Sequence, residues 1–361
     1  MPPATNLRIL SGVQPSGKLH IGNYFGAIRQ HIALQERGNA FYFIADYHAL
    51  TTLKEAEAKE AEDARNNNRT PKTAREILSE NVRDVALDYL ALGLDPDKAV
   101  FYRQSDIPEV CELAWILSTV SGMGLLERAH SYKDKIANGI SPTVGLFTYP
   151  ILMAADILIV RSNRVPVGRD QVQHLEMTRD IAGYFNQAYG EVFPEPDCHL
   201  AEAAVVPGTD GRKMSKSYGN TIDIFAEGKA LQATVMGILT DSTPLDAPKN
   251  PDTCNVFALY KLFATDDEVS KLAEQYRNPL IDAESRKGRA FGFGDAKKLL
   301  LAKIDAEFAQ PRLKRKQLAA DPVAVEEILR QGAIRARRET TQTMELVRAA
   351  VGMHARPAVS M

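Results

Sequence analysis

Short β-rich runs alternate with helical patterns along the first half of this 361-residue chain, and this alternation constrains the fold more than any other feature. The runs Arg8–Val13, Ala40–Ala45 and Ala99–Arg103 have the length and apolar content of buried strands. A helix is expected from His20 toward Arg37, between the first two runs. Strands that alternate with helices build a parallel sheet from βαβ units, and such sheets bind ligands at the carboxyl ends of their strands. The sequence therefore predicts an α/β fold.

Later segments extend this pattern less regularly. Ile157–Val160 and Ala203–Val206 are further candidate strands, although the first can equally end a helix. Helical spacing is clear over Thr73–Leu92. The charged segment Lys54–Arg75 before it is expected to be a helix that frays into an exposed loop.

The second half of the chain differs, because no strand alternation returns beyond about residue 225. Ala230–Met353 has a helical pattern, with breaks expected at Pro244–Pro251, Gly288–Gly294 and Pro311. We expect two domains: a parallel-sheet domain over residues 1–225 and an all-helical domain over residues 226–361.

Composition excludes several classes of protein. A formal net charge of −2 gives no overall attraction for nucleic acid, so any such contact needs a local basic patch. Cys111, Cys198 and Cys254 are far apart, which indicates neither a disulfide framework nor a zinc or iron–sulfur site. The start has no export signal, and the longest apolar stretch, Pro150–Val160, is too short to span a bilayer. We expect a cytoplasmic protein with no membrane contact and no protein-held metal.

A turn rich in small residues opens the first helix. It reads Pro15-Ser16-Gly17-Lys18-Leu19-His20-Ile21-Gly22-Asn23. Backbone N–H groups and the positive helix end at such a turn attract anions. Residues 12–19 also come close to the phosphate-binding loop G-x-x-x-x-G-K-[ST], but Leu19 replaces the hydroxyl that would hold magnesium, and Pro15 removes an N–H donor. We therefore disfavour a P-loop nucleotidase.

A second nucleotide motif lies past the middle of the chain, at Lys213-Met214-Ser215-Lys216-Ser217. A mobile loop with two lysines can neutralise a departing pyrophosphate. Ser215 and Ser217 are expected to shape the loop and not to act as nucleophiles. The two motifs together indicate adenylyl transfer from ATP.

The pair of motifs resembles the HIGH-type and KMSKS signatures of class I aminoacyl-tRNA synthetases. The sequence between the two motifs resembles that of the bacterial tryptophanyl-tRNA synthetase family. Four segments carry this second resemblance in the family's order: residues 12–17, 46–51 (Asp-Tyr-His-Ala-Leu-Thr), 148–158 and 165–171. The resemblance implies a Rossmann-like catalytic domain and a C-terminal helical domain for the tRNA anticodon. The tyrosyl enzyme is the alternative, since it shares the fold and a KMSKS-type loop. A third possibility is a synthetase-like regulator that binds tryptophan or RNA without charging tRNA.

A tryptophan pocket is expected around Asp156. Indole offers one N–H donor and no acceptor, so its site needs one buried acceptor among apolar walls. Asp156 lies within an apolar run, where a buried carboxylate suggests function, although a helix-surface or capping Asp is the alternative. Met153 and Leu10 would form walls of the pocket. Tyr149 and Gln171 resemble the family's ligands for the substrate ammonium.

The resemblance also places the ATP ligands. It implies that the nucleotide and its phosphates contact Gln14, Pro15, Ser16, His20, Gly22 and Asn23, together with the loop residues Lys213, Met214, Ser215, Lys216 and Ser217. Asn23 stands where the HIGH tetrad ends in His, which removes one imidazole from any proton transfer. Gly168, Arg169 and Asp170 resemble the turn that binds the ribose, and Val205 would contact adenine.

The expected reaction needs no nucleophilic residue. The tryptophan carboxylate attacks the α-phosphorus of ATP in line, and Lys213, Lys216 and Lys135 stabilise the charge with a Mg²⁺ carried by the phosphates. His20 would donate a hydrogen bond to a phosphate oxygen. The 3′ end of tRNA(Trp) then takes the tryptophanyl group and AMP leaves.

The C-terminal half supplies a local basic region for tRNA. Residues 286–338 hold 14 Lys and Arg against 6 Asp and Glu, a net of 14 − 6 = +8, with clusters at 314–316 and 335–338. A solvated helix face is the alternative for any one of these residues. The resemblance implies a homodimer, to which the run Trp115, Ile116 and Leu117 would contribute if it does not pack in the core.

Overall fold

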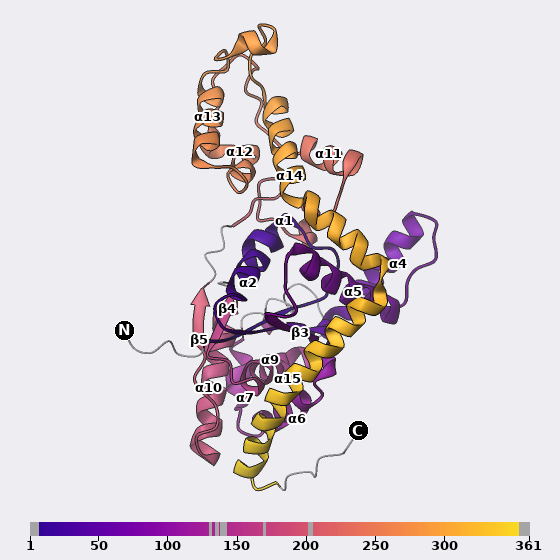
Figure 1. The fold of residues 1–361 in the computed structure, drawn as a ribbon, viewed down its shortest axis with the longest axis vertical. Coiled ribbons are helices and arrows are strands. Elements are labelled where there is room, and N and C mark those ends of the chain that lie inside the picture. The colour runs from indigo at the N-terminus through magenta and orange to yellow at the C-terminus, as the bar shows by residue number, and fades with distance from the viewer. Residues whose placement is uncertain are drawn as a thin grey trace. The chain divides into compact units, whose positions relative to one another are not determined.

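The computed structural model of the chain describes residues 7–129, 132–133, 137, 143–168, 171–200 and 205–353. They pack as two compact units, and neither unit is a single stretch of chain (Figure 1). Unit 1 comprises residues 1–17, 31–201 and 318–361, and unit 2 comprises residues 18–30 and 202–317. The functional division at residue 225 stays a prediction. In the described part of the chain, no helix has the length and apolar character needed to cross a membrane.

Unit 1 is built on a parallel sheet of five strands in the order β3-β2-β1-β4-β5, which confirms the α/β prediction. The strands are β1 (Arg8–Val13), β2 (Asn39–Ile44), β3 (Ala99–Arg103), β4 (Arg164–Val167) and β5 (Asp197–Leu200). The strand order reverses between β1 and β4, and ligands of such sheets bind where this reversal occurs. Gln14 follows β1 and Gly168 follows β4, so two residues predicted to bind the nucleotide lie at the carboxyl ends of these strands.

The sequence predicted β1 and β3 with their observed bounds and β2 to within one residue. It missed β4 and β5. The four residues of β4 include Pro166, a residue that argues against a strand by sequence pattern. Ile157–Val160 ends a helix, which is the alternative that the sequence left open, because α9 continues through Ile159. The expected strand at Ala203–Val206 falls partly outside the described residues, and Val205 and Val206 are not in a strand.

Helices surround the sheet in unit 1. They are α3 (Asp46–Ala49), α4 (Leu53–Asn66), α5 (Ala74–Leu92), α6 (Glu109–Ser118), α7 (Met123–Glu127), α9 (Val144–Ile159), α10 (Val172–Tyr189) and α15 (Pro322–Ala350). The predicted helix over Thr73–Leu92 is α5, where the Thr73 hydroxyl accepts from the Glu76 N–H and the Glu76 carboxylate accepts from the Thr73 N–H. Gly93, at φ 113°, ends it.

The C-terminal helix α15 returns to the sheet. Figure 1 shows its yellow ribbon running beside β3. At Gly332 the helix approaches so closely that an added Cβ would lie 1.7 Å from the Phe101 carbonyl oxygen of β3. Only glycine fits at this crossing, so the close packing of α15 on β3 depends on Gly332.

Unit 2 carries residues 18–23 of the first nucleotide motif and the whole of the second. Its helical elements are α1 (Ile21–Asn23), a π-helical turn (Tyr24–Ile28), the start of α2 (Arg29–Leu34), α11 (Gly228–Met236), α12 (Asn255–Tyr260), α13 (Asp266–Arg277) and most of α14 (Phe293–Ala320). The break expected at Pro311 is wrong, because α14 continues through it. Phe308 and Arg312, on either side of the proline, are buried, and this packing compensates for the missing N–H donor.

Candidate active site

The structure brings the two nucleotide motifs into contact within unit 2. The backbone N–H of Gly22, in the first turn of α1, donates to the Met214 sulfur at 3.3 Å. Met214 is buried, whereas Lys213 and Lys216 on either side of it along the chain are exposed. The loop therefore places an apolar residue against the helix start and exposes both of its lysines to solvent.

A short antiparallel bridge holds the first motif in place. His20 pairs with Asp223, the Ile21 N–H donates to the Ile222 carbonyl at 3.0 Å, and the Ile224 N–H donates to the Leu19 carbonyl at 3.3 Å. The Asn23 amide oxygen accepts from the His20 N–H at 3.1 Å and so caps the helix start. An added Cβ at Gly22 would lie 2.9 Å from His20 Nδ1, so a larger residue would push the motif apart.

His20 is buried and uncharged at neutral pH. Burial, followed by the charge of Lys216, lowers the pKa of His20 to about 4, while Asp223 acts in the opposite direction. Among the described residues, its Nδ1 has no hydrogen-bond partner. A buried ring nitrogen without a partner is suited to hydrogen-bond a ligand.

Ser215 shapes the KMSKS loop. Its hydroxyl accepts from the Ser217 N–H at 3.3 Å and caps the short 3-10 turn Lys216–Tyr218. This contact is consistent with the structural role that the sequence suggested for Ser215.

The predicted specificity residue of unit 1, Asp156, lies on α9 with only 5% of its surface exposed, which excludes the helix-surface alternative. Gln104 Nε2 donates to both carboxylate oxygens, at 2.8 and 2.9 Å. His48 Nε2 lies 2.9 Å from Oδ2, a distance at which its N–H donates to the carboxylate. We call Asp156, His48 and Gln104 the acid cluster.

Burial and hydrogen bonding oppose each other in the acid cluster. Burial raises the pKa of the Asp156 carboxyl, whereas the hydrogen bonds from His48 and Gln104 favour its charged form. Gln104 is itself held by the N–H groups of Tyr47 and His48, which donate to its carbonyl oxygen at 3.1 and 3.4 Å. The cluster thus presents a buried acceptor in a fixed orientation.

The other predicted tryptophan ligands lie on elements that pack with the acid cluster. Leu10 is buried in the core of unit 1, and Met153 packs against that core. The Tyr149 hydroxyl lies 2.6 Å from His174 Nε2 of α10, and the Tyr149 ring stands edge-on to the His48 ring at 6.3 Å. Gln171 precedes α10 and lies within one helical turn of His174.

Comparison with known proteins identifies the family. The family described as tRNA synthetases class I (W and Y) matches residues 2–293. The tryptophan–tRNA ligase of Rhodopirellula baltica is 48% identical over 348 residues, which cover 96% of this chain and 100% of the relative. That of Fusobacterium nucleatum is 49% identical over 96% of this chain and 98% of the relative.

A solved structure agrees. The tryptophanyl-tRNA synthetase from Campylobacter jejuni, complexed with ADP and tryptophan, has a TM-score of 0.84 at 44% identity and covers 96% of this chain and 100% of its own. The chain belongs to the tryptophanyl-tRNA synthetase family. A tyrosyl-tRNA synthetase from Archaeoglobus fulgidus, at 18% identity and a TM-score of 0.60, shares the fold alone.

The remaining residues predicted for a tryptophanyl-tRNA synthetase are divided between the units. In unit 1, Gln14 and Ser16 are exposed and Pro15 is buried after β1, while Gly168 is half-buried after β4. In unit 2, Val205 is 73% exposed. The predicted residues Lys135, Arg169 and Asp170 lie outside the described residues.

Sequence reasoning missed two residues of the acid cluster, His48 and Gln104. A signal for His48 was present, since it lies in the tryptophanyl-tRNA synthetase-like segment at residues 46–51. Gln104 directly follows β3, at the carboxyl end of a strand, where functional polar residues of parallel sheets concentrate.

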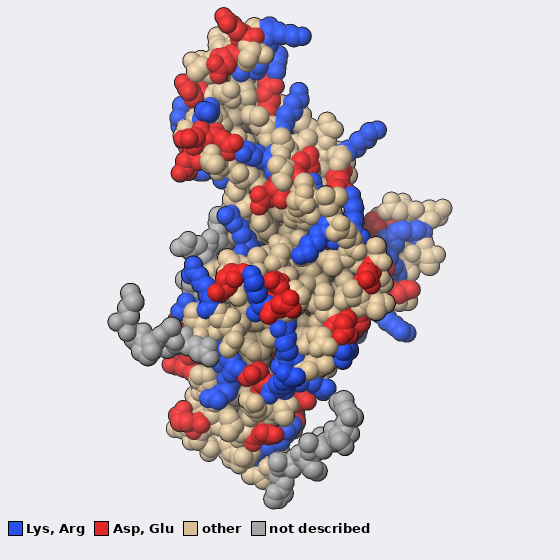
Figure 2. All heavy atoms as spheres, in the orientation of Figure 1, with Lys and Arg blue, Asp and Glu red and all other residues tan. Residues whose placement is uncertain are grey.

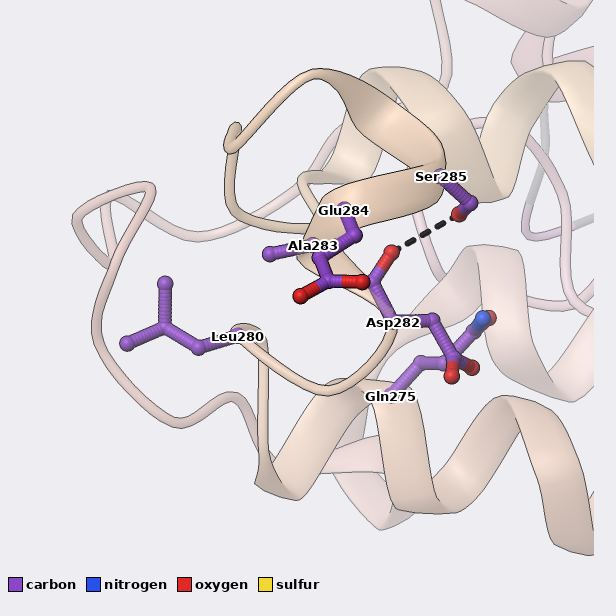
Figure 3. Close-up of a pocket in the computed structure, with 6 residues that line it drawn as sticks. All are labelled: Gln275, Leu280, Asp282, Ala283, Glu284 and Ser285. Atoms are coloured by element: carbon purple, nitrogen blue, oxygen red, sulfur yellow. Dashed lines mark hydrogen bonds between the residues drawn. The ribbon is translucent and has the colours of Figure 1, made fainter.

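A polar hollow in unit 2 lies apart in sequence from these motifs. It measures about 750 Å³ and is lined by Gln275, Leu280 and residues 282–285. Figure 3 shows Leu280 pointing away from the acidic side chains, and the Ser285 hydroxyl donating to the Asp282 carbonyl at 2.7 Å. Asp282 and Glu284 disfavour phosphate binding in this hollow.

Proposed function

We propose that this chain activates L-tryptophan with ATP to tryptophanyl-adenylate and transfers the tryptophanyl group to the 3′ end of tRNA(Trp), releasing pyrophosphate and AMP. It is an enzyme, a tryptophan–tRNA ligase. The observation that carries the proposal is the contact between Gly22 and Met214, because it joins the two motifs that adenylyl transfer requires.

In the activation step, a carboxylate oxygen of tryptophan bonds to the α-phosphorus as the bond from this phosphorus to the pyrophosphate oxygen breaks. Negative charge grows on the phosphate oxygens, and cations positioned for that charge lower the barrier. We assign this work to Lys213 and Lys216, and to Lys135 outside the described residues, with a Mg²⁺ that ATP carries. His20 donates a hydrogen bond to a phosphate oxygen, in keeping with its neutral ring.

In the transfer step, a terminal hydroxyl of the tRNA attacks the carbonyl carbon of the adenylate. The bond from this carbon to the phosphate oxygen breaks, and AMP carries away the electron pair. No side chain forms a covalent bond in either step, so the protein acts by positioning and by charge.

Tryptophan selection is assigned to the acid cluster. A carboxylate has about four acceptor positions, and Gln104 and His48 make three hydrogen bonds to Asp156, which leaves a position for the indole N–H. Met153 and Leu10 supply apolar walls. Tyr149 and Gln171 bind the substrate ammonium.

The nucleotide is assigned to the two motifs and to the strand ends of unit 1. Its ligands are Gln14, Pro15, Ser16, His20, Gly22, Asn23 and residues 213–217, with Gly168, Arg169 and Asp170 for the ribose and Val205 for adenine. The reversal of strand order between β1 and β4 supports the assignment of Gln14 and Gly168.

The helical region over residues 226–361 is assigned to tRNA binding. Figure 2 shows acidic and basic side chains interspersed over the face in view. On this face, attraction for phosphates would come from single exposed cations. Lys314 and Arg338 are exposed. Arg335 donates to the Ala99 carbonyl at 2.8 Å, Arg337 pairs with Glu109 at 3.4 Å and Lys316 pairs with Glu227 at 2.5 Å, so these three have intramolecular roles.

A homodimer is also part of the proposal. Ile116 and Leu117 are buried as core residues, but Trp115 on the same helix, α6, is 72% exposed. Met123 on α7 and Val144 on α9 are exposed as well, and α9 packs against both α6 and α7. Exposed apolar side chains of this size favour contact with a second copy. Sedimentation as a monomer at micromolar concentration would contradict this assignment. A cytoplasmic location, where tRNA is charged, completes the proposal.

Tryptophan-dependent exchange of pyrophosphate into ATP tests the function. We expect exchange with tryptophan and none with tyrosine. Exchange with tyrosine alone would point to the tyrosyl enzyme. Tryptophan binding without any exchange would point to a regulator that does not charge tRNA.

A further inference from the structure

Asn220 is a buried side chain that no step of the proposed reaction uses, and it contacts the KMSKS loop (residues 213–217) on two sides. Only 2% of its surface is exposed. Its amide oxygen accepts from the Ser215 N–H at 2.8 Å, and its Nδ2 donates to the Lys213 carbonyl at 3.2 Å. One amide therefore holds the loop backbone immediately before and after Met214.

The segment before the loop closes around Asn220. Its Nδ2 also donates to the Asp210 carboxylate at 2.7 Å. The Met214 N–H donates to the Val206 carbonyl at 2.9 Å, and an added Cβ at Gly208 would lie 2.2 Å from Asn220 Nδ2. The site is thus shaped for this one amide.

Asp210 is held in turn from the exposed side. Its other carboxylate oxygen accepts from Arg212 Nε at 2.7 Å, and the Arg212 guanidinium lies 4.3 Å from the centre of the Tyr218 ring. Asp210 therefore links the buried amide to the outer surface of the loop.

We propose that Asn220 is a positioning residue for adenylate formation. Its amide fixes the backbone at Lys213 and Ser215, so that the Met214 sulfur meets the Gly22 N–H and the two lysines are held where the phosphates bind. This inference rests on the proposed function. Charge stabilisation depends on groups that are already in place before the reaction, so a loosely held loop loses rate even though it keeps both lysines.

The expected result is a loss of rate without a loss of tryptophan affinity. Asn220→Ala leaves the Ser215 N–H and the Asp210 carboxylate without their buried partner. We expect single-turnover adenylate formation at saturating ATP to slow by roughly tenfold or more, with tryptophan Kd unchanged, because the acid cluster lies in unit 1.

A matched control separates positioning from general damage. Asn186 in unit 1 makes the same kind of contact with another loop, since its Nδ2 donates to the Phe193 carbonyl at 2.8 Å and its Oδ1 accepts from the Val192 and Phe193 N–H groups at 3.0 Å. Asn186→Ala should leave adenylate formation within twofold of wild type. Thermal unfolding of both variants checks that each is folded.

Exchanging the side chains of Asn220 and Asp210 gives a sharper test, and it remains possible if Asn220→Ala does not fold. Asn220→Asp keeps an acceptor for Ser215 but sets two carboxylates against each other. Adding Asp210→Asn restores a donor opposite the new carboxylate. We expect the double variant to be faster than Asn220→Asp, with the Asp210→Asn single variant completing the cycle.

Limited trypsin digestion reports on the loop independently of activity. Cleavage after Arg212, Lys213 and Lys216 should be faster in Asn220→Ala than in wild type or Asn186→Ala. The inference would be overturned if Asn220→Ala left the cleavage rate unchanged or kept adenylate formation within twofold of wild type. It would also be overturned if Asn220→Ala weakened tryptophan affinity as much as it slowed adenylate formation, or if the double variant were no faster than Asn220→Asp. Absence of exchange in the wild-type chain would overturn the proposed function itself.

Discussion

The acid cluster of unit 1 and the KMSKS loop of unit 2 handle charge in opposite ways. In unit 1 the charged group is Asp156, which is buried and hydrogen-bonded by His48 and Gln104. In unit 2 the charged groups are Lys213 and Lys216, exposed on a loop that is anchored through its backbone. A rigid buried acceptor suits the choice of one amino acid, whereas exposed cations on a held loop suit a charge that appears only in the transition state.

The comparison predicts its largest effect at the loop. Lys216→Ala should slow adenylate formation by roughly a hundredfold or more while leaving tryptophan binding nearly intact, since the interaction of this lysine with the phosphates strengthens in the transition state. Single-turnover kinetics at saturating ATP, with tryptophan binding measured separately, check this. An unchanged rate would remove the KMSKS loop from the mechanism.

The acid cluster should show a smaller effect of a different kind. Asp156→Asn keeps the volume but can turn its NH₂ toward a donor, so tryptophan kcat/KM should fall by about 1.5–3 kcal/mol with ATP binding unchanged. A tryptophan analogue without the indole N–H should lose much less on the same substitution. Equal losses for both substrates would show that Asp156 supports the pocket without reading the N–H.

The two basic clusters sharpen the comparison for tRNA. Lys314→Glu with Arg338→Glu should weaken tRNA affinity several-fold and lower the salt slope by about one for each phosphate that is no longer neutralised, while sparing adenylate formation. Arg335→Glu should instead lower the free energy of unfolding, because Arg335 binds carbonyls of its own unit. Titrations of tRNA binding across a salt series test this. An unchanged salt slope for the double variant would show that these cations belong to a solvated surface and do not contact tRNA.

The last prediction concerns pH and stability, and here the units should behave alike. Burial lowers the pKa of His31 in unit 1 to about 4, and burial with Lys216 does the same for His20 in unit 2. Between about pH 6.5 and 4 the unfolded chain binds protons that the native chain does not. The free energy of unfolding should therefore be retained above this window and fall as pH falls through it, by at most about 1.4 kcal/mol per pH unit for His31.

Denaturant unfolding measured from pH 7 to 4 tests this expectation. His31→Gln and His20→Gln should each flatten the slope, because glutamine does not titrate. A slope that is the same in both variants and in wild type would show that other groups carry the pH dependence.

Local patterns in the sequence determined much of the fold and both nucleotide motifs. The strands at Arg8–Val13 and Ala99–Arg103 were predicted because short apolar runs between turn residues have few other folds. Helix α5 was predicted from helical spacing over Thr73–Leu92, and the hydrogen bonds between Thr73 and Glu76 at its start join residues only three apart. Interactions between residues that lie a few positions apart depend only on the local sequence, so the sequence alone is sufficient to predict them.

Tertiary structure decided what depends on distant partners. His48 lies 108 positions from Asp156 and Gln104 lies 52 positions from it, so no local pattern indicates that they share a hydrogen-bond network. The sequence showed the apolar run at residues 115–117 but not the exposure of Trp115. Pro311 predicted a break that the burial of Phe308 and Arg312 prevents. Periodicity defines the apolar face of a helix, but long-range packing decides which element that face contacts. The same packing places α15 against β3, where the two elements cross at Gly332.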